Sequence, residues 1–184
     1  MFEIPRIAGG YGTILADPPW SFSDKGSRAA PDSKKKFKYP TMSERELRVL
    51  PVAELAAPKA HLYVWTTDVH LSLALNLIDQ WGFVFKKSLV WVKRGTSGKL
   101  QIGMGHYYRT AKELCLFATR GKLQAAVHNL PDVFEAPRGR HSEKPEQIHR
   151  WAEQLSPGPR LEMFARRQVT EWTCWGNQLT EVTP

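Results

Sequence analysis

Two adjacent prolines fix where the first strand of this chain must end. The apolar run 11–16 has the composition of a short buried strand, and Asp17, Pro18 and Pro19 follow it directly. Because proline lacks a backbone N–H, a strand in the middle of a sheet cannot continue through this pair. The aspartate is therefore expected at the end of a buried strand, at the edge of a sheet.

Strand-like and helix-like segments alternate along the rest of the chain. This alternation is typical of an α/β fold whose sheet has parallel members, and a chain of 184 residues without a repeat favours a single domain, 1–184. In such sheets, sites form beyond the carboxyl ends of the strands. The expected strands are 11–16, 61–67, 83–92, 113–119, 133–137, 161–165 and 172–175, and the expected helices are 43–50, 68–80 and 145–155.

Basic charge gathers between these elements. The chain has 26 Lys and Arg against 18 Asp and Glu, a formal charge of +8, together with seven Trp, five Tyr and eight Phe. Such a surface suits a polyanion whose bases can stack on aromatic rings. Two connections, 21–40 and 94–110, are expected to be substrate loops. The basic clusters at 34–38 and at Arg138, Arg140 and Lys144 are candidates for phosphate contacts, with a purely solvated face as the alternative.

Several other classes of protein are disfavoured. The chain has only two cysteines, Cys115 and Cys174, which is too few for a disulfide framework or a four-cysteine zinc site. Both lie in apolar runs, which favours buried reduced thiols. The six histidines show no metal-ligand spacing. No apolar stretch approaches the roughly 20 residues of a membrane span, and the first residues lack a signal pattern. A cytoplasmic protein without a metal or a membrane partner is expected.

The tetrapeptide that ends the first strand can hold a planar amino group. The Asp17 carboxylate and the Pro18 carbonyl, whose direction the next proline fixes, are two acceptors that match the hydrogens of an NH2 group. Trp20 would offer an aromatic face to a flat base. Both hydrogen bonds would make an exocyclic amine more electron-rich and stabilise its developing positive charge while it displaces a sulfonium methyl. The alternative is a plain Asp-Pro turn with Trp20 in the core.

The segment Ile14-Leu-Ala-Asp-Pro-Pro-Trp20 resembles the catalytic motif of the MT-A70 family of N6-adenine methyltransferases. The resemblance covers roughly residues 11 to 180. It implies a Rossmann-like methyltransferase sheet with helices on both faces, in which the catalytic motif precedes the cofactor-binding segments. It also implies S-adenosylmethionine as the methyl donor. Similar blocks follow in the family's order, beginning at Tyr39, Leu62, Trp91, Lys112, Ser142, Leu161 and Gly176.

The resemblance implies roles for single residues as well. The motif residues Asp17, Pro18, Pro19 and Trp20 would be catalytic, and Tyr39, Glu113 and Lys144 would contact the substrate. Arg167 and Gln168 replace a His-Asn pair of the family, and Arg167 could serve an anion directly. The segment 1–10 is too short to show an acidic residue that some members use for the adenine ring, so weaker cofactor binding or another side chain at that edge is expected. The cofactor-binding residues implied are Asp17, Lys144, Arg166, Arg167, Asn177 and Gln178.

The expected activity is N6-adenine methylation of nucleic acid. DNA is favoured over RNA, because the chain has no added RNA-reading domain and compact relatives are similar to phage and bacterial DNA-modifying enzymes. Three alternatives are an RNA N6-adenine methyltransferase, a catalytically silent nucleic-acid-binding partner subunit, and N4-cytosine methylation. The last is disfavoured because related cytosine enzymes more often carry Ser where this chain has Asp17. The family's catalytic subunits pair through the loop between the middle strands, which allows a homodimer or a heterodimer.

Overall fold

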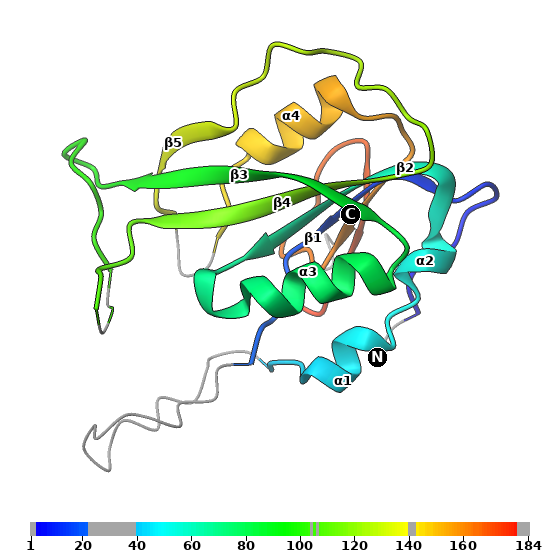
Figure 1. Ribbon diagram of the computed structural model, residues 1–184, viewed down its shortest axis with the longest axis horizontal. Helices are drawn as coiled ribbons and strands as arrows, with labels where there is room; N and C mark the ends of the chain where they lie inside the picture. Colours follow the sequence, from blue (N-terminus) through cyan, green and yellow to red (C-terminus); the bar gives the residue numbers. More distant parts are fainter. Residues whose placement is uncertain (1–2, 22–39, 104, 106, 140–142, 180–184) are drawn as a thin grey trace, which may run out of the picture.

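One seven-stranded sheet organises the molecule (Figure 1). The computed structural model describes residues 3–21, 40–103, 105, 107–139 and 143–179. The strands are β1 (Tyr11–Ala16), β2 (Ala56–Thr66), β3 (Val84–Arg94), β4 (Lys112–Arg120), β5 (Val133–Pro137), β6 (Arg160–Met163) and β7 (Trp172–Trp175). Their order across the sheet is β5-β3-β4-β2-β1-β6-β7.

Strand direction decides which residues meet at the edge of the sheet. Among the described strands, β4 alone runs antiparallel to its neighbours, β2 and β3, whereas the pairs β1–β2, β1–β6, β3–β5 and β6–β7 are parallel. The beginning of β4 therefore lies at the same edge as the ends of the other strands. This places Glu113, the second residue of β4, on the edge where Asp17 follows β1.

Helices cover both faces of the sheet, as predicted. The helices α1 (Glu44–Arg48), α2 (Val52–Leu55) and α3 (Leu71–Gln80) contribute to one buried cluster, which takes Ile14 from β1. The helix α4 (Gln147–Leu155) contributes to a second cluster, which takes Leu15. Consecutive strand residues point to opposite faces, so Ile14 and Leu15 each reach a different helical layer. In Figure 1, α3 and α4 lie on opposite sides of the strands.

Most element boundaries differ from the predictions by one to three residues, and three differences have a structural interpretation. β2 begins at Ala56 rather than at residue 61, although it includes Pro58. The pairing of β1 with β2 shifts register between Tyr11 and Thr13, and Pro58 lies in that irregular stretch, where the missing N–H breaks no regular ladder. The short helix α2 was not predicted. β6 ends at Met163 rather than at residue 165, because Phe164 has φ 66°, a left-handed conformation that ends a strand.

Candidate active site

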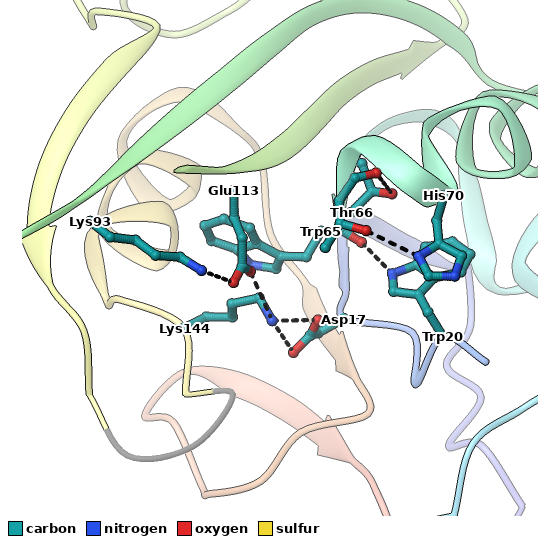
Figure 2. A network of polar contacts seen from close by, with 9 residues as sticks. Asp17, Trp20, Trp65, Thr66, His70, Lys93, Glu113 and Lys144 are labelled. Carbon is teal, nitrogen blue, oxygen red and sulfur yellow. Dashed lines mark hydrogen bonds and ion pairs between the residues drawn. The ribbon is translucent and has the colours of Figure 1, made fainter. Parts of the chain in front are cut away.

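An ion pair between Asp17 and Lys144 lies at the centre of the site (Figure 2). Asp17 follows the last residue of β1, and Lys144 precedes α4. The Lys144 Nζ lies 2.8 Å from Asp17 Oδ1 and 2.9 Å from Oδ2. The side chains of Asp17 and Lys144 are 18% and 16% exposed, so this ion pair is largely buried rather than on the surface.

Two more charges extend this pair into a network. Glu113 Oε2 lies 3.4 Å from the Lys144 Nζ, and its Oε1 accepts a hydrogen bond from Lys93 at the end of β3. The Lys144 Nζ also lies 5.6 Å from the centre of the Trp65 ring, within the range of a cation–π contact. Positive and negative groups therefore alternate along the edge of the sheet, as Figure 2 shows.

Burial and these partners together set the protonation of the network. Burial raises the pKa of Asp17, and the nearby Lys144 and Arg166 offset part of that increase. Burial would also raise the pKa of Glu113, but Lys144 and Lys93 outweigh it, so the pKa of Glu113 is lowered. The pKa of Lys144 is raised, because attraction by Asp17 and Glu113 exceeds the cost of its burial. Lys144 is therefore a cation and Glu113 a carboxylate at neutral pH.

Hydrogen bonds fix the backbone of the predicted catalytic motif, 17–20. The Pro18 carbonyl accepts the Trp20 backbone N–H at 2.8 Å, and the Pro19 carbonyl accepts the Met42 N–H at 2.9 Å. A carbonyl oxygen has two lone pairs, so the Pro18 oxygen retains one for a further donor. The direction of this carbonyl thus depends on Trp20 as well as on the following proline.

Trp20 is more enclosed than the sequence suggested. Its side chain belongs to the core and the residue is 7% exposed, where an open face for a base was expected. The indole N–H donates to the Trp65 carbonyl at 3.1 Å, and the ring stacks on His70 with 5.2 Å between ring centres. Most of the indole surface is therefore used within the protein.

Among the described residues, Asp17 and Pro19 each line a cavity that opens at this edge of the sheet. We call the first the charged cavity: it has a volume of about 290 Å³, and Asp17, Lys144 and Arg166 line it. We call the second the apolar cavity: it also has a volume of about 290 Å³, and Met42, Trp175 and Asn177 are among its lining residues. The other predicted cofactor residues in the wall of the charged cavity are Arg167 and Gln178.

Phe164 lies in the walls of both cavities, and sequence reasoning did not single it out. Its φ of 66° is rare for a bulky side chain, and such backbone strain concentrates at functional sites. The ring packs edge-on against Trp175, with 5.4 Å between ring centres. The one available sequence signal was its place near the end of the expected strand 161–165.

The remaining predicted residues are placed as follows. Tyr39, Arg140 and most of the first substrate loop lie outside the described residues. Arg138 is exposed. Cys115 and Cys174 are free cysteines, buried and half-buried, and burial raises the pKa of both thiols. Within the described ranges, no three His, Cys, Asp or Glu side chains are placed to hold a metal ion.

None of the helices in the described part of the chain combines the length and the hydropathy that a bilayer-crossing segment needs.

Comparison with known proteins identifies relatives of the whole chain. The MT-A70 family model matches residues 11–178. The type II methyltransferase M.MunI of Mycoplasma sp is 29% identical over 197 residues, which cover 97% of this chain and 81% of that protein. The N(6)-adenosine-methyltransferase catalytic subunit METTL3 of Homo sapiens is 30% identical over 179 residues, which cover 94% of this chain and 29% of that subunit.

A Drosophila melanogaster protein described as N(6)-adenosine-methyltransferase MT-A70-like is 31% identical, again over 94% of this chain but 28% of its own length. The chain thus spans less than a third of these two N(6)-adenosine-methyltransferases and about four-fifths of M.MunI. The resemblance seen in the sequence is confirmed: this chain belongs to the MT-A70 family.

Proposed function

We propose that this chain methylates the N6 amine of adenine in a nucleic acid. The observation that carries the proposal is the position of Asp17, a sheltered carboxylate at the carboxyl edge of the sheet, in the wall of the charged cavity. A carboxylate in this place can accept a hydrogen bond from an amino group whose nitrogen gains positive charge during the reaction. The relatives named as N(6)-adenosine-methyltransferases support the same chemistry.

The donors and acceptors of the two cavities fit S-adenosylmethionine. This molecule has a zwitterionic amino-acid half and an adenosine half, and the site offers one charged and one apolar cavity that share Phe164. Lys144, Arg166 and Arg167 could hold the cofactor carboxylate, and Asp17 the ammonium group. Together the cavities fall within the usual range of ligand pockets, roughly 300–1,000 Å³.

Two consecutive residues connect the cavities. Asn177 lines the apolar cavity, and Gln178 lines the charged cavity. Their amides provide both donors and acceptors, which suits the ribose hydroxyls and the edge of an adenine ring. The ribose would therefore lie at the passage between the cavities, beside Phe164.

The residues of the chain orient the amine and balance its charge. When bound, S-adenosylmethionine supplies an electrophilic methyl group on a sulfonium. Asp17 and the free lone pair of the Pro18 carbonyl would accept the two N6 hydrogens, which directs the nitrogen lone pair toward that methyl. The N–C bond forms as the S–C bond breaks, and one N6 proton is released, leaving N6-methyladenine and S-adenosylhomocysteine.

We propose that Glu113 acts on the same base. It lies one residue into β4 and shares Lys144 with Asp17, so the two carboxylates lie on either side of one cation. Lys93 holds its second oxygen. We assign Glu113 to the base-binding side of the site, together with Tyr39.

We propose DNA as the polymer. The chain matches the type II methyltransferase M.MunI over 81% of that protein's length but METTL3 over 29% of its length, so the likeness to the type II methyltransferase extends over more of the relative. Specificity would then come from 21–40 and 94–110, or from a second subunit. For duplex DNA, extrusion of the target base would cost a few kcal/mol. The free cysteines agree with a cytoplasmic location.

The test uses protein shown by calorimetry to bind S-adenosylmethionine. It is incubated with methyl-labelled cofactor and, separately, with duplex DNA, single-stranded DNA and RNA, and the products are digested to nucleosides. We expect labelled N6-methyladenine, with DNA as the better substrate. Label in RNA alone would show that the substrate is RNA rather than DNA. Label in N4-methylcytosine would show that the methylated base is cytosine rather than adenine. No labelled nucleoside from any polymer would refute the proposed function.

A further inference from the structure

His70 is a buried histidine whose two ring nitrogens connect distant parts of the chain. It ends a short 3-10 helix, Asp68–His70, that follows β2, and it is 7% exposed. Its Nε2 lies 3.1 Å from the Ser21 carbonyl oxygen, and its Nδ1 lies 3.1 Å from Thr67 Oγ1. Because a carbonyl oxygen can only accept, Nε2 is the donor in the contact with Ser21.

The His70 ring also packs against Trp20, the last residue of the predicted catalytic motif. The imidazole of His70 stacks on the indole of Trp20, with 5.2 Å between centres and 14° between planes. The indole N–H donates to the Trp65 carbonyl at 3.1 Å (Figure 2). Trp20 and Ser21 are thus both held by residues from the end of β2 and the turn after it.

The contacts of His70 with Trp20 also affect the Pro18 carbonyl, which would hold the substrate amine. The Trp20 backbone N–H donates to the Pro18 carbonyl at 2.8 Å, so a shift of Trp20 turns that carbonyl. Pro18 and Pro19 have fixed φ angles and cannot absorb such a shift by rotation about N–Cα. The carbonyl and the neighbouring Asp17 would then no longer match the two hydrogens of one amine.

We propose that His70 is a positioning residue for methyl transfer, which holds the chain after the catalytic motif through Ser21 and Trp20. The inference rests on the proposed function. Packing alone does not account for a histidine here, because a buried imidazole loses its hydration and is tolerated only when its nitrogens find partners. The partner of Nε2 is 49 residues away in sequence, directly after the motif.

Three substitutions separate the hydrogen bond from the stacking. In His70→Gln the amide nitrogen reaches the position of Nε2 and can still donate to Ser21. In His70→Asn the amide nitrogen reaches only the position of Nδ1, so that donor is lost. His70→Phe keeps an aromatic ring against Trp20 without any donor. His128→Asn, at an exposed histidine, is the matched control.

The readouts are the cofactor dissociation constant by calorimetry and single-turnover methyl transfer per cofactor-binding molecule. We expect unchanged cofactor affinity in all variants, and transfer that falls by on the order of 100-fold in His70→Asn and His70→Phe, the size of effect that a displaced reacting group produces. His70→Gln should recover most of the rate. Equal rates for His70→Gln and His70→Asn, or wild-type transfer by His70→Asn, would overturn the inference. Wild-type protein without transfer would instead refute the proposed function.

Discussion

At the scale of single residues, the proposed function depends on an ionised Asp17, although burial raises the pKa of this carboxyl group. A neutral Asp17 would have no negative charge to stabilise a positive nitrogen. Lys144 supplies the compensating charge, and Glu113 and Lys93 complete a neutral group of four. In the proposed function, Lys144 would therefore have two roles, one toward Asp17 and one toward the cofactor carboxylate.

The pH dependence of methyl transfer should report this coupling. Transfer needs the Asp17 carboxylate, whose pKa lies above its ordinary 3.8, so activity should fall as the pH drops through that raised value. Lys144→Met removes an attraction that favours the ionised form, and the acidic limb of the pH profile should move to higher pH. The measurement is the single-turnover rate against pH at saturating cofactor.

The control for this prediction is Lys87→Met, which removes an exposed lysine paired with Asp132. It should leave the acidic limb in place. An acidic limb that stays in place or moves to lower pH in Lys144→Met would show that Asp17 is not the group that titrates.

Some site residues could be predicted from the sequence, and others could not. The two prolines mark the end of β1, so the position of Asp17 at the edge of the sheet follows from the local sequence. Lys93 meets Glu113 only because β4 is reversed, and His70 meets Ser21 only through the fold. Such partners carry no local sequence pattern.

At the scale of elements, the turns after β6 and β7 pack closely against each other and are joined by a backbone hydrogen bond. Ala165 donates its backbone N–H to the Trp175 carbonyl at 2.9 Å, and Gly176 follows so closely that a Cβ there would lie 2.1 Å from the Ala165 carbonyl oxygen. These turns carry Phe164 and Asn177, which line the apolar cavity. The glycine therefore permits the approach that forms one wall of the proposed cofactor site.

Gly176→Ala should destabilise the close packing of the turns after β6 and β7. The added methyl overlaps with backbone atoms that cannot move independently, which predicts a loss of about 1–3 kcal/mol in the free energy of unfolding, together with weaker cofactor binding. Thermal unfolding with and without cofactor measures both effects. Gly95→Ala is the control, since its Cβ would lie 3.6 Å from the nearest side chain. Equal melting temperatures for the two variants would contradict the prediction.

The connection between β3 and β4 presents two tyrosines at its tip. Tyr107 and Tyr108 are 97% and 91% exposed, and the tip is closed by a hydrogen bond from the Gly103 N–H to the Thr110 carbonyl at 2.7 Å. The segment 93–112 contains no Asp or Glu. Exposed rings suit bases beside the target nucleotide. The cations of this segment are Lys93, Arg94, Lys99, Arg109 and Lys112, of which Lys93, Arg94 and Lys112 form ion pairs with carboxylates of other segments.

The double substitution Tyr107→Ala with Tyr108→Ala should weaken nucleic-acid binding. Base–aromatic stacking contributes about 1–3 kcal/mol per base, so the dissociation constant for the polymer should rise by roughly tenfold or more. Cofactor affinity should not change. Fluorescence anisotropy with a labelled oligonucleotide measures this, with Val49→Ala at another exposed apolar position as the control. Unchanged polymer affinity with a changed molecular mass in solution would assign the tip to a protein interface instead.

Element types were more predictable than their directions and ends. Local composition predicted all seven described strands and the presence of α1, α3 and α4, because burial on a sheet leaves a regular pattern. The reversal of β4 was not predicted, since the pairing of distant strands leaves no mark within either one. The end of β6 at Met163 depends on Phe164, whose conformation is imposed by its neighbours.

At the scale of the whole molecule, the net charge of +8 should dominate the first encounter with a polyanion. Each phosphate neutralised releases counterions, so the logarithm of the binding constant should fall linearly with the logarithm of the salt concentration. Contacts to about four or five phosphates would give a slope of roughly −4. Anisotropy titrations over a range of salt concentrations measure it. A slope near zero would show that the excess charge has another role.

The proposed function depends most on the Asp17 carboxylate, which would hold the amine that receives the methyl group. The most direct measurement is single-turnover transfer by wild-type protein and Asp17→Asn, each preloaded with labelled S-adenosylmethionine, so that a change in cofactor affinity cannot affect the rate. We predict a fall of at least ~100-fold in the rate of Asp17→Asn, as for the loss of a preorganised electrostatic contact. An Asp17→Asn variant that binds cofactor and transfers at the wild-type rate would contradict it.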